Sequence, residues 1–342
     1  MTPLSATDAI SPAWDHTQRL LLTHRNWRTV LKIGTVAVFA EISGCNTGFN
    51  NMRHTPAAHS GAMAAMMAFA LIIGLVALVI GLIVFYVSSR FQFVLFDLVL
   101  RSDTTVAPSW RRFGSVTWRW IGLKLLFLLA AIICAAPLVV PVILSFIRAA
   151  RASGTEGELA NPVAFVFSML GFIVALFFVA LIVAFFYIML RDFGLPSMAL
   201  EDASIGVTVS RVIRFVRDEP GQVILYAILL LLMRIAGAIV AYFVLAILAL
   251  IAFIPLGGGG LIFWLALRHD GIGAHVVMIV GWVVLGLILA AVTIVAGIML
   301  FGYLFTFFQA YALYFLGGRY PMLGAWLERP PASPDNVAQP QV

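Results

Sequence analysis

Long apolar runs separated by basic, tryptophan-containing segments are the feature that most constrains how this chain can fold. A helix needs about 20 consecutive apolar residues to cross the hydrocarbon core of a bilayer. Several runs in this 342-residue chain exceed that length. The sequence therefore predicts an all-α integral membrane protein. Its main spans are expected near residues 62–87, 121–146, 163–190, 223–256 and 276–308.

The composition supports lipid as the solvent for most of the surface. The chain is 63% hydrophobic and 11% charged, whereas an average soluble domain is about half apolar and about a quarter charged. Its net charge of +6 could suggest nucleic acid. The basic residues lie beside the apolar runs, however, where anionic headgroups would meet them. We therefore expect anionic membrane lipids as partners and no nucleic acid.

A shorter apolar stretch, residues 29–43, is the candidate for span one. Lys32 interrupts it and Glu41 ends it. Lys32 could lengthen the span by extending its ammonium group to the interface. A re-entrant half-helix is the alternative. With this stretch included, the sequence predicts a six-span helical bundle that forms one transmembrane domain over residues 1–328, followed by a disordered cytoplasmic tail over 329–342.

Basic and aromatic segments precede the predicted hairpins of spans. Residues 11–28 mix leucine and tryptophan with arginine, which predicts an interfacial amphipathic helix. Two further segments, near residues 90–120 and 191–222, predict interfacial elbows. Within the first elbow, Asp97 and Arg101 have the i,i+4 spacing of a helical ion pair.

Small residues mark the last two spans. Gly257 to Gly260 predict a break in span five, after which residues 261–267 would lie in the interface. Two pairs have the small-x-x-x-small spacing that favours close packing, within the chain rather than between copies. They are Gly237 with Ala241 and Gly286 with Ala290.

The chain also shows an internal periodicity. A shift of 100 residues superimposes spans two and three on spans four and five and brings Arg111 onto Arg211. A shift of 93 residues brings Trp27 onto Trp120. The pattern predicts three elbow-plus-hairpin repeats with interfacial amphipathic helices. Their bounds are about 11–89, 90–190 and 191–316. The alternative is that any protein built from helical hairpins looks periodic.

Basic residues are distributed unevenly between the two sides of the predicted spans. Sixteen of the 21 Lys and Arg residues fall in the N-terminal segment, the elbows and the C-terminal region, and four fall in the opposite loops. Basic loops stay in the cytoplasm. The sequence therefore predicts a multi-pass protein of the cell inner membrane with both termini cytoplasmic.

Two groups of charged residues are the candidate sites. Four elbow arginines are predicted to contact anionic lipid headgroups. They are Arg111, Arg112, Arg211 and Arg214. Arg234 lies inside span five, where a buried arginine usually has a partner, and Glu41 is the one acidic residue inside a predicted span. An intramembrane pair of these two, extension of Arg234 to the interface, and a contact with substrate or lipid phosphate all stay open.

Metal binding and catalysis are not expected. Two loop pairs of histidines could in principle meet at a metal ion with Asp270. They are His54 with His59 and His269 with His275. Their i,i+5 and i,i+6 spacings put neither pair on one face of a helix, so solvated loops are favoured over a metal site. The sequence lacks His-Glu-x-x-His and Gly-x-Ser-x-Gly motifs, so we expect no cofactor and no enzyme.

Three stretches carry a resemblance to a protein family. They are Trp27-Arg-Thr-Val-Leu-Lys-Ile-Gly with the Gly/Asn-rich residues 44–51, Arg90-Phe-Gln-Phe-Val-Leu-Phe-Asp97 with Trp110-Arg-Arg, and Leu195-Pro-Ser-Met-Ala-Leu200. In these stretches the chain resembles a group of uncharacterised prokaryotic multi-pass membrane proteins. That group is similar to the membrane domain found before some glycerophosphodiester phosphodiesterases. The catalytic domain of those enzymes has no counterpart in this sequence, so the resemblance implies a non-catalytic membrane protein and supplies no active residues.

Two function classes follow from these observations. The basic, aromatic elbows favour a non-enzymatic accessory protein that binds lipid or organises the membrane. Arg234 and the interrupted spans favour the alternative, a transporter or channel for a small molecule or lipid.

Overall fold

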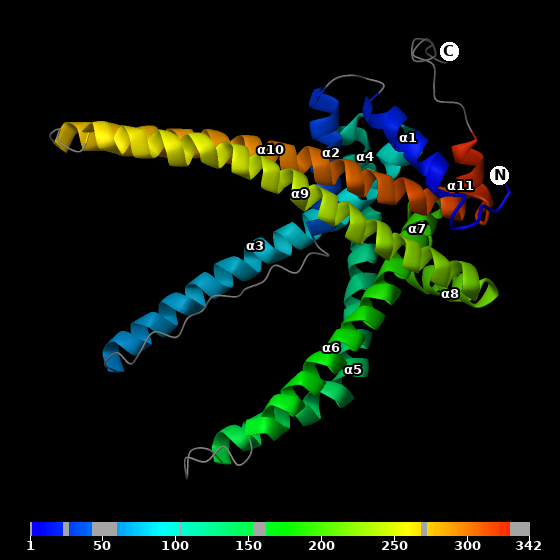
Figure 1. Cartoon of the computed structure of the whole chain (residues 1–342). Coiled ribbons are helices and arrows are strands. Elements are labelled where there is room, and N and C mark those ends of the chain that lie inside the picture. Colours follow the sequence, from blue (N-terminus) through cyan, green and yellow to red (C-terminus); the bar gives the residue numbers. More distant parts are fainter. Residues whose placement is uncertain are drawn as a thin grey trace. The chain divides into compact units, whose positions relative to one another are not determined.

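A computed structural model describes residues 2–22, 27–42, 60–102, 104–152, 162–267 and 272–328, which form helices and no strands (Figure 1). This confirms the all-α expectation. The helices are α1 (Ile10–Leu22), α2 (Trp27–Ile42), α3 (Ser60–Arg101), α4 (Val106–Arg112), α5 (Gly114–Ala152), α6 (Pro162–Met189), α7 (Leu195–Glu201), α8 (Ile205–Asp218), α9 (Pro220–Leu267), α10 (Ile272–Gly317) and α11 (Pro321–Leu327). A π-helical turn, η1 (Leu190–Gly194), joins α6 to α7.

Five helices of the described chain are long and apolar enough to cross a membrane. The segments are Phe69–Arg101, Gly114–Pro141, Met169–Glu201, Pro220–Ile251 and Ile279–Gly317. At 1.5 Å per residue, the 33 residues of Met169–Glu201 span about 50 Å. This exceeds the roughly 30 Å hydrocarbon core, so such a helix tilts or extends beyond it. At most 17% of the most apolar window of each helix is buried inside the chain, so lipid is needed to cover the rest.

The expected break in span five is wrong. Residues 257–260 and 261–267 continue α9 as one helix to Leu267. Each glycine costs a helix only about 1 kcal/mol relative to alanine. An interruption would instead leave backbone N–H and C=O groups without their helical partners. The uninterrupted helix therefore has the lower free energy.

The first elbow ends earlier in the sequence than predicted. Its short helix is α4, and the long helix α5 already begins at Gly114. Trp118, Arg119 and Trp120 therefore belong to the first turns of a long helix. The prolines Pro137 and Pro141 lie inside that helix without ending it.

The predicted first span is the 16-residue helix α2, which is about 24 Å long. It lies outside the set of five long helices, so its crossing of the membrane stays a prediction. α2 packs on α10 through two glycines. A Cβ atom on Gly302 would collide with the backbone of Gly34, and a Cβ atom on Gly34 would lie 2.8 Å from the carbonyl oxygen of Ile298. The two backbones thus meet where neither position has room for a side chain.

The described residues divide into two compact units, residues 1–114 with 221–342, and residues 115–220. In the first unit, distant parts of the sequence meet near the end of α3. Lys32 of α2 donates a hydrogen bond to the carbonyl oxygen of Thr104 at 2.8 Å. The guanidinium of Arg101 lies 5.0 Å from the ring centroid of Trp326 in α11. The start of α2, the end of α3 and α11 therefore share one end of this unit.

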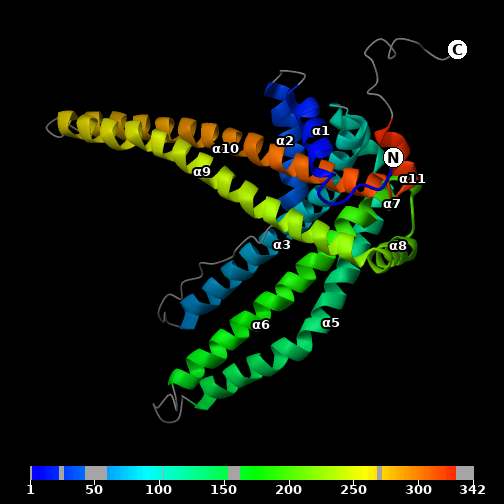
Figure 2. The same ribbon diagram turned by 45° about the vertical axis from the view of Figure 1, so that its right-hand side comes forward.

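Helices α9 and α10 of the first unit run side by side in both ribbon views (Figure 1, Figure 2). Near the start of α9, Tyr226 stacks on Tyr311 and Phe315 of α10, with ring centroids 5.0 and 4.5 Å away. Further along, a Cβ atom on Gly237 would lie 3.0 Å from Leu304 of α10, and Ala241 is fully buried. This small-residue pair is therefore used for packing within the chain.

The second unit is a helical hairpin with a short helix at its end. α5 and α6 run side by side (Figure 2), with the rings of Phe127 and Tyr187 6.0 Å apart. Arg119 near the start of α5 donates hydrogen bonds to the side chain and carbonyl oxygen of Asp202, just after α7, at 2.9 and 3.0 Å. Both ends of the hairpin therefore lie at the same end of the unit.

The N-terminal segment is fastened to the ends of α3 and α10 in the first unit. The hydroxyl of Tyr311 donates to the carbonyl oxygen of Ala6 at 2.9 Å. In α1, Nε2 of His16 lies 2.8 Å from the carbonyl oxygen of Val99, and Nδ1 lies 3.2 Å from the Tyr314 hydroxyl. A carbonyl oxygen can only accept, so Nε2 carries the proton, and Nδ1 of the neutral ring accepts from Tyr314.

The glycine crossing gives a stability prediction. Gly302→Ala should destabilise the protein by about 1–3 kcal/mol, because the added methyl group forces α2 and α10 apart. The measurement is thermal unfolding in detergent. Gly286→Ala in the same helix is the matched control, because a Cβ atom there meets nothing within 4 Å. Equal melting temperatures for the two variants would contradict the close crossing.

The His16 contacts give a pH prediction. Burial lowers the pKa of His16 below its ordinary value of 6.5 and nearby Arg19 lowers it further, although the hydrogen bond to Val99 raises it. The unfolded chain therefore takes up this proton at a higher pH than the folded chain does. Stability should fall as the pH drops below about 6.5, and the decrease should level off below the folded-state pKa. His16→Gln should show a shallower fall in melting temperature between pH 7.5 and 5.5. Identical slopes would count against the fastening role of His16.

Candidate functional site

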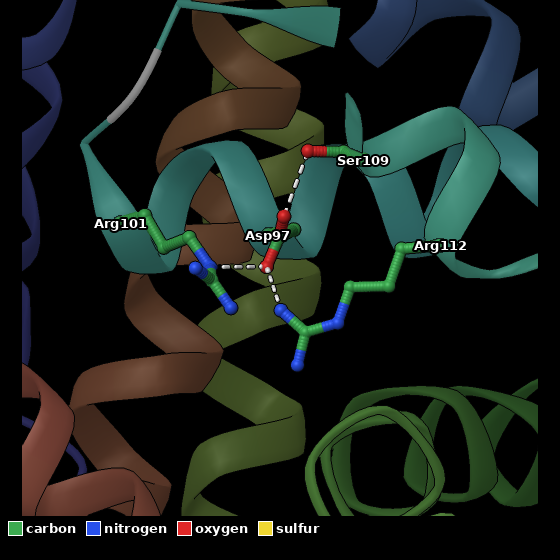
Figure 3. A network of polar contacts seen from close by, with 4 residues as sticks. All are labelled: Asp97, Arg101, Ser109 and Arg112. Atoms are coloured by element: carbon green, nitrogen blue, oxygen red, sulfur yellow. Dashed lines mark hydrogen bonds and ion pairs between the residues drawn. The ribbon is translucent and has the colours of Figure 1, made fainter. Parts of the chain in front are cut away.

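A buried carboxylate holds the first elbow together (Figure 3). Asp97, near the end of α3, is 6% exposed. One oxygen accepts from Arg101 Nε at 2.7 Å, and the other accepts from the Ser109 hydroxyl of α4 at 2.7 Å. Arg112 Nη1 lies 4.0 Å from the first oxygen. The predicted Asp97–Arg101 pair is therefore confirmed, and the same carboxylate also fixes α4, a contact that spacing alone did not reveal.

A second arginine of α3 fastens the last turn of α4. Arg90 donates through Nε and Nη2 to the carbonyl oxygen of Trp110, at 2.9 and 2.5 Å. Its guanidinium also lies 4.4 Å from the centroid of the Trp110 ring. Phe93 and Phe113 stack beside this contact, with centroids 5.5 Å apart. Two contacts therefore fix α4 to α3, one at the Trp110 carbonyl oxygen and one at the Ser109 hydroxyl. The arginines that follow Trp110 project from this fixed helix.

In the second unit, α8 is held by its less polar side. Thr208 and Val212 are buried, and the Ser197 hydroxyl of α7 donates to the Thr208 hydroxyl at 3.4 Å. Phe193 of η1 meets Phe215 of α8 edge to face, with centroids 4.8 Å apart. Arg214 and Arg217 lie on the opposite side of α8, turned away from the helices that hold it, whereas Arg211 is paired with Glu201 of α7.

The four predicted headgroup arginines are all exposed, but they differ in their partners. Arg211 forms an ion pair with Glu201 at 2.6 Å, and Arg112 lies near Asp97. Within the described parts of the chain, Arg111 and Arg214 form no ion pair. The geometry thus divides the predicted set into two arginines beside carboxylates and two that keep an uncompensated charge. That they contact lipid stays a prediction.

Arg191 and Asp192 form a buried charged pair that no sequence motif indicates. Both side chains are below 8% exposed, with Arg191 Nε 4.0 Å from Asp192 Oδ1. They lie in the π-helical turn η1, which fits an extra residue between α6 and α7. Such turns often occur at functional positions. A sequence pattern does not indicate the turn, because its residues look like an ordinary helix continuation.

The charged pair that was predicted to lie inside the membrane, Arg234 with Glu41, is found in the first unit. Arg234 Nη2 of α9 is 4.0 Å from Glu41 Oε1 of α2, with side chains 29% and 10% exposed. The guanidinium lies 5.5 Å from the Phe308 ring centroid. Its Nε is buried and has no hydrogen-bond acceptor among the described residues. The two groups are thus near each other, while their energetic coupling stays a prediction.

Hydroxyl and amide groups of α3 gather beside Glu41. Ser88 and Gln92 both donate to the carbonyl oxygen of Ala40, at 3.3 and 3.0 Å. This carbonyl belongs to the last turn of α2, where helix carbonyls have no partner within the helix. The polar residues of α3 therefore satisfy the end of α2 at the level of Glu41 and Arg234.

The side chains of the candidate metal-binding histidines fall outside the described part of the chain. His54, His59, His269 and Asp270 lie outside the described residues, as does the side chain of His275. Among the residues that are described, no group of three or more His, Cys, Asp or Glu side chains could hold a metal ion.

The Asp97 contacts predict a graded effect on stability. Asp97→Ala removes the acceptor for Ser109 and two arginines, so it should cost about 1.5–3 kcal/mol, whereas Ser109→Ala should cost about 1 kcal/mol. Thermal unfolding in lipid nanodiscs measures both. Asp218→Ala is the control, since this exposed carboxylate forms no ion pair in the described chain. If Asp97→Ala melted at the same temperature as the control, Asp97 would not hold the elbow.

The Arg234–Glu41 proximity predicts non-additive stability changes. Arg234→Leu and Glu41→Leu should each lower the melting temperature in detergent, because each leaves one charge without its opposite. The double variant should recover part of the loss. Simple addition of the two losses would show that the residues do not act as a pair.

Comparisons with known proteins place the whole membrane region in one family. The model of the Family of unknown function (DUF7544) matches residues 4–326. No curated protein and no solved structure matches the chain, so the resemblance to the membrane domain of glycerophosphodiester phosphodiesterases stays a prediction. The match covers nearly the entire chain, including both elbows and all five long helices. The chain therefore belongs to the Family of unknown function (DUF7544).

Proposed function

We propose that this protein is a non-enzymatic, multi-pass membrane protein that binds anionic lipid headgroups through its elbows. The observation that carries the proposal is the position of Arg111 and Arg214. Each is exposed, has no ion pair in the described chain, and projects from a short helix fixed to the end of a long apolar helix. A membrane helix ends near the headgroups, where each arginine gains about 1 kcal/mol from anionic lipid.

We also propose that the two elbows are copies of one structural unit. Ser102 and Asp202, 100 residues apart, are the two non-glycine residues with positive φ among those described, at 52° and 51°. Ser102 directly follows α3 and Asp202 directly follows α7, and an extended residue, Thr105 or Ser204, then precedes the elbow helix. Such left-handed residues are uncommon outside glycine, so their recurrence at the predicted shift supports the repeat.

Side-chain contacts recur at shifts of 99 to 102 residues. Asp97 accepts from Ser109, while Ser197 donates to Thr208. The rings of Phe93 and Phe113 meet in the first elbow, and those of Phe193 and Phe215 meet in the second. Both contacts fasten the elbow helix to the preceding long helix. These recurrences favour duplication over the chance periodicity of helical hairpins.

A six-span arrangement with cytoplasmic termini is the topology that we propose. In the first unit, α1, α4 and α11 lie near the same end. In the second unit, the start of α5 and the end of α7 also share one end. A chain that begins and ends on the same side of a membrane crosses it an even number of times. The five long helices therefore need a sixth span, and we assign it to α2. The positive-inside rule then assigns the elbow side to the cytoplasm of the cell inner membrane.

Transport of an anionic solute or lipid is the second candidate function. Arg234 favours it, because the buried Nε has no acceptor in the described chain and its ion pair with Glu41 is long. A polar molecule could supply the missing acceptor. A water-filled path to Arg234, detected by labelling a cysteine near this residue with a water-soluble thiol reagent, would support transport over a purely lipid-binding role.

The lipid-binding proposal predicts which arginines matter. The double variant Arg111→Gln with Arg214→Gln should reduce retention of phosphatidylglycerol by at least fivefold in native mass spectrometry, given about 1 kcal/mol per arginine. The control is Arg119→Gln with Arg211→Gln, which removes the same charge from arginines paired with Asp202 and Glu201. Equal losses in the two doubles would indicate a general charge effect, and unchanged retention in the first double would refute the proposal.

A further inference from the structure

In the described chain, helix α8 carries more arginines without an acidic ion-pair partner than helix α4 does. Arg211, Arg214 and Arg217 follow one another at three-residue intervals, and all three are exposed. Arg211 is paired with Glu201 at 2.6 Å. Arg214 and Arg217 form no ion pair in the described chain, even though Asp218 follows them directly. The described part of α8 therefore presents two uncompensated guanidinium groups, while α4 presents only that of Arg111.

These two arginines are spaced to act on the same molecule. Residues three apart on a helix are neighbours, with Cβ atoms about 5–6 Å from each other. Both lie opposite the buried Thr208 and Val212, which fix the helix on its other side. A guanidinium grips a phosphate with two parallel N–H donors. Two such groups side by side suit a ligand that carries two phosphate groups.

The surroundings of the two arginines favour a lipid over a soluble phosphate compound. Ile213 is 61% exposed and Val207 is 44% exposed on the same helix. Exposed apolar side chains among arginines are typical of a helix at a membrane surface, where the apolar groups reach the acyl region while the guanidinium groups stay with the phosphates. A soluble diphosphate would leave Ile213 and Val207 in water.

We propose that α8 is a binding site for a lipid whose headgroup carries two phosphodiester groups, namely cardiolipin. Arg214 holds one phosphate and Arg217 the other. Once one phosphate is bound, the second contact is intramolecular, and its effective concentration exceeds that of a separate lipid. This inference rests on the proposed lipid-binding function and names the lipid class for one of its two elbows.

The test is lipid competition on the full chain in nanodiscs that contain cardiolipin and phosphatidylglycerol at equal phosphate content. Native mass spectrometry then counts the lipids retained by the protein. We expect the wild-type protein to retain cardiolipin at least fivefold more than phosphatidylglycerol. Arg214→Gln with Arg217→Gln should bring this ratio close to one. Arg119→Gln should leave the ratio unchanged, because this exposed arginine is paired with Asp202 and takes no part in the proposed lipid binding.

The charge-preserving variant Arg214→Lys with Arg217→Lys separates geometry from charge. It should lower the ratio partly, because lysine binds phosphate as a point charge. It also provides a folded comparison if the glutamine variant unfolds. Equal retention of the two lipids by the wild-type protein would overturn the cardiolipin assignment while leaving the proposed function intact. A ratio that persists in both α8 variants would also overturn it. Failure to retain either lipid would refute the proposed function itself.

Discussion

The uncovered apolar surface of the five long helices is the constraint on which the rest of this structure depends. Their most apolar windows are at most 17% buried inside the chain, so lipid rather than protein surrounds them. Side-chain contacts between such helices gain little from the hydrophobic effect, since lipid tails are as apolar as leucine. Polar and close-packed contacts must then define the arrangement. These contacts are found where α2 crosses α10 at Gly34 and Gly302, and at the elbows.

The elbows combine that structural task with the binding of anionic lipid that we propose. In the first, Asp97 binds Ser109 and lies beside Arg101 and Arg112, so its carboxylate compensates part of the local positive charge. In the second, the corresponding position is Ser197, which fastens α8 with a neutral hydrogen bond. The first elbow is thus stabilised by a charged residue and the second by a hydroxyl. Under the duplication that we propose, the two elbows can differ in how strongly they attract anions without a change in backbone shape.

Much of the helical architecture could be predicted from the sequence. Apolar run length located the long helices, because crossing the hydrocarbon core requires about 20 apolar residues, and i,i+4 spacing located the Asp97–Arg101 pair. The break at Gly257 was predicted wrongly, since each glycine costs a helix only about 1 kcal/mol relative to alanine and α9 continues to Leu267. Local sequence patterns therefore predict well those features that depend on a single helix, such as its position or an i,i+4 ion pair.

The contacts between helices could not be predicted from local sequence patterns. Nothing in the spacing of Ser109 or Trp110 indicates that they meet Asp97 and Arg90, because those contacts depend on the left-handed turn at Ser102. The shift that aligns Trp27 with Trp120 also conceals a difference. Trp27 is 59% exposed, whereas Trp120 is fully buried. The predicted repeat therefore does not give the environment of each side chain.

The measurement that tests this account most directly is sidedness labelling of single cysteines in intact cells. Cys45 and Cys134 are first replaced by serine, and Ser210→Cys in α8 and Gly258→Cys near the far end of α9 are then introduced separately. A membrane-impermeant thiol reagent should label the Gly258 variant in intact cells and the Ser210 variant only after the cells are opened. Labelling of the Ser210 variant in intact cells would place the arginines of α8 outside the cytoplasm and would contradict the account.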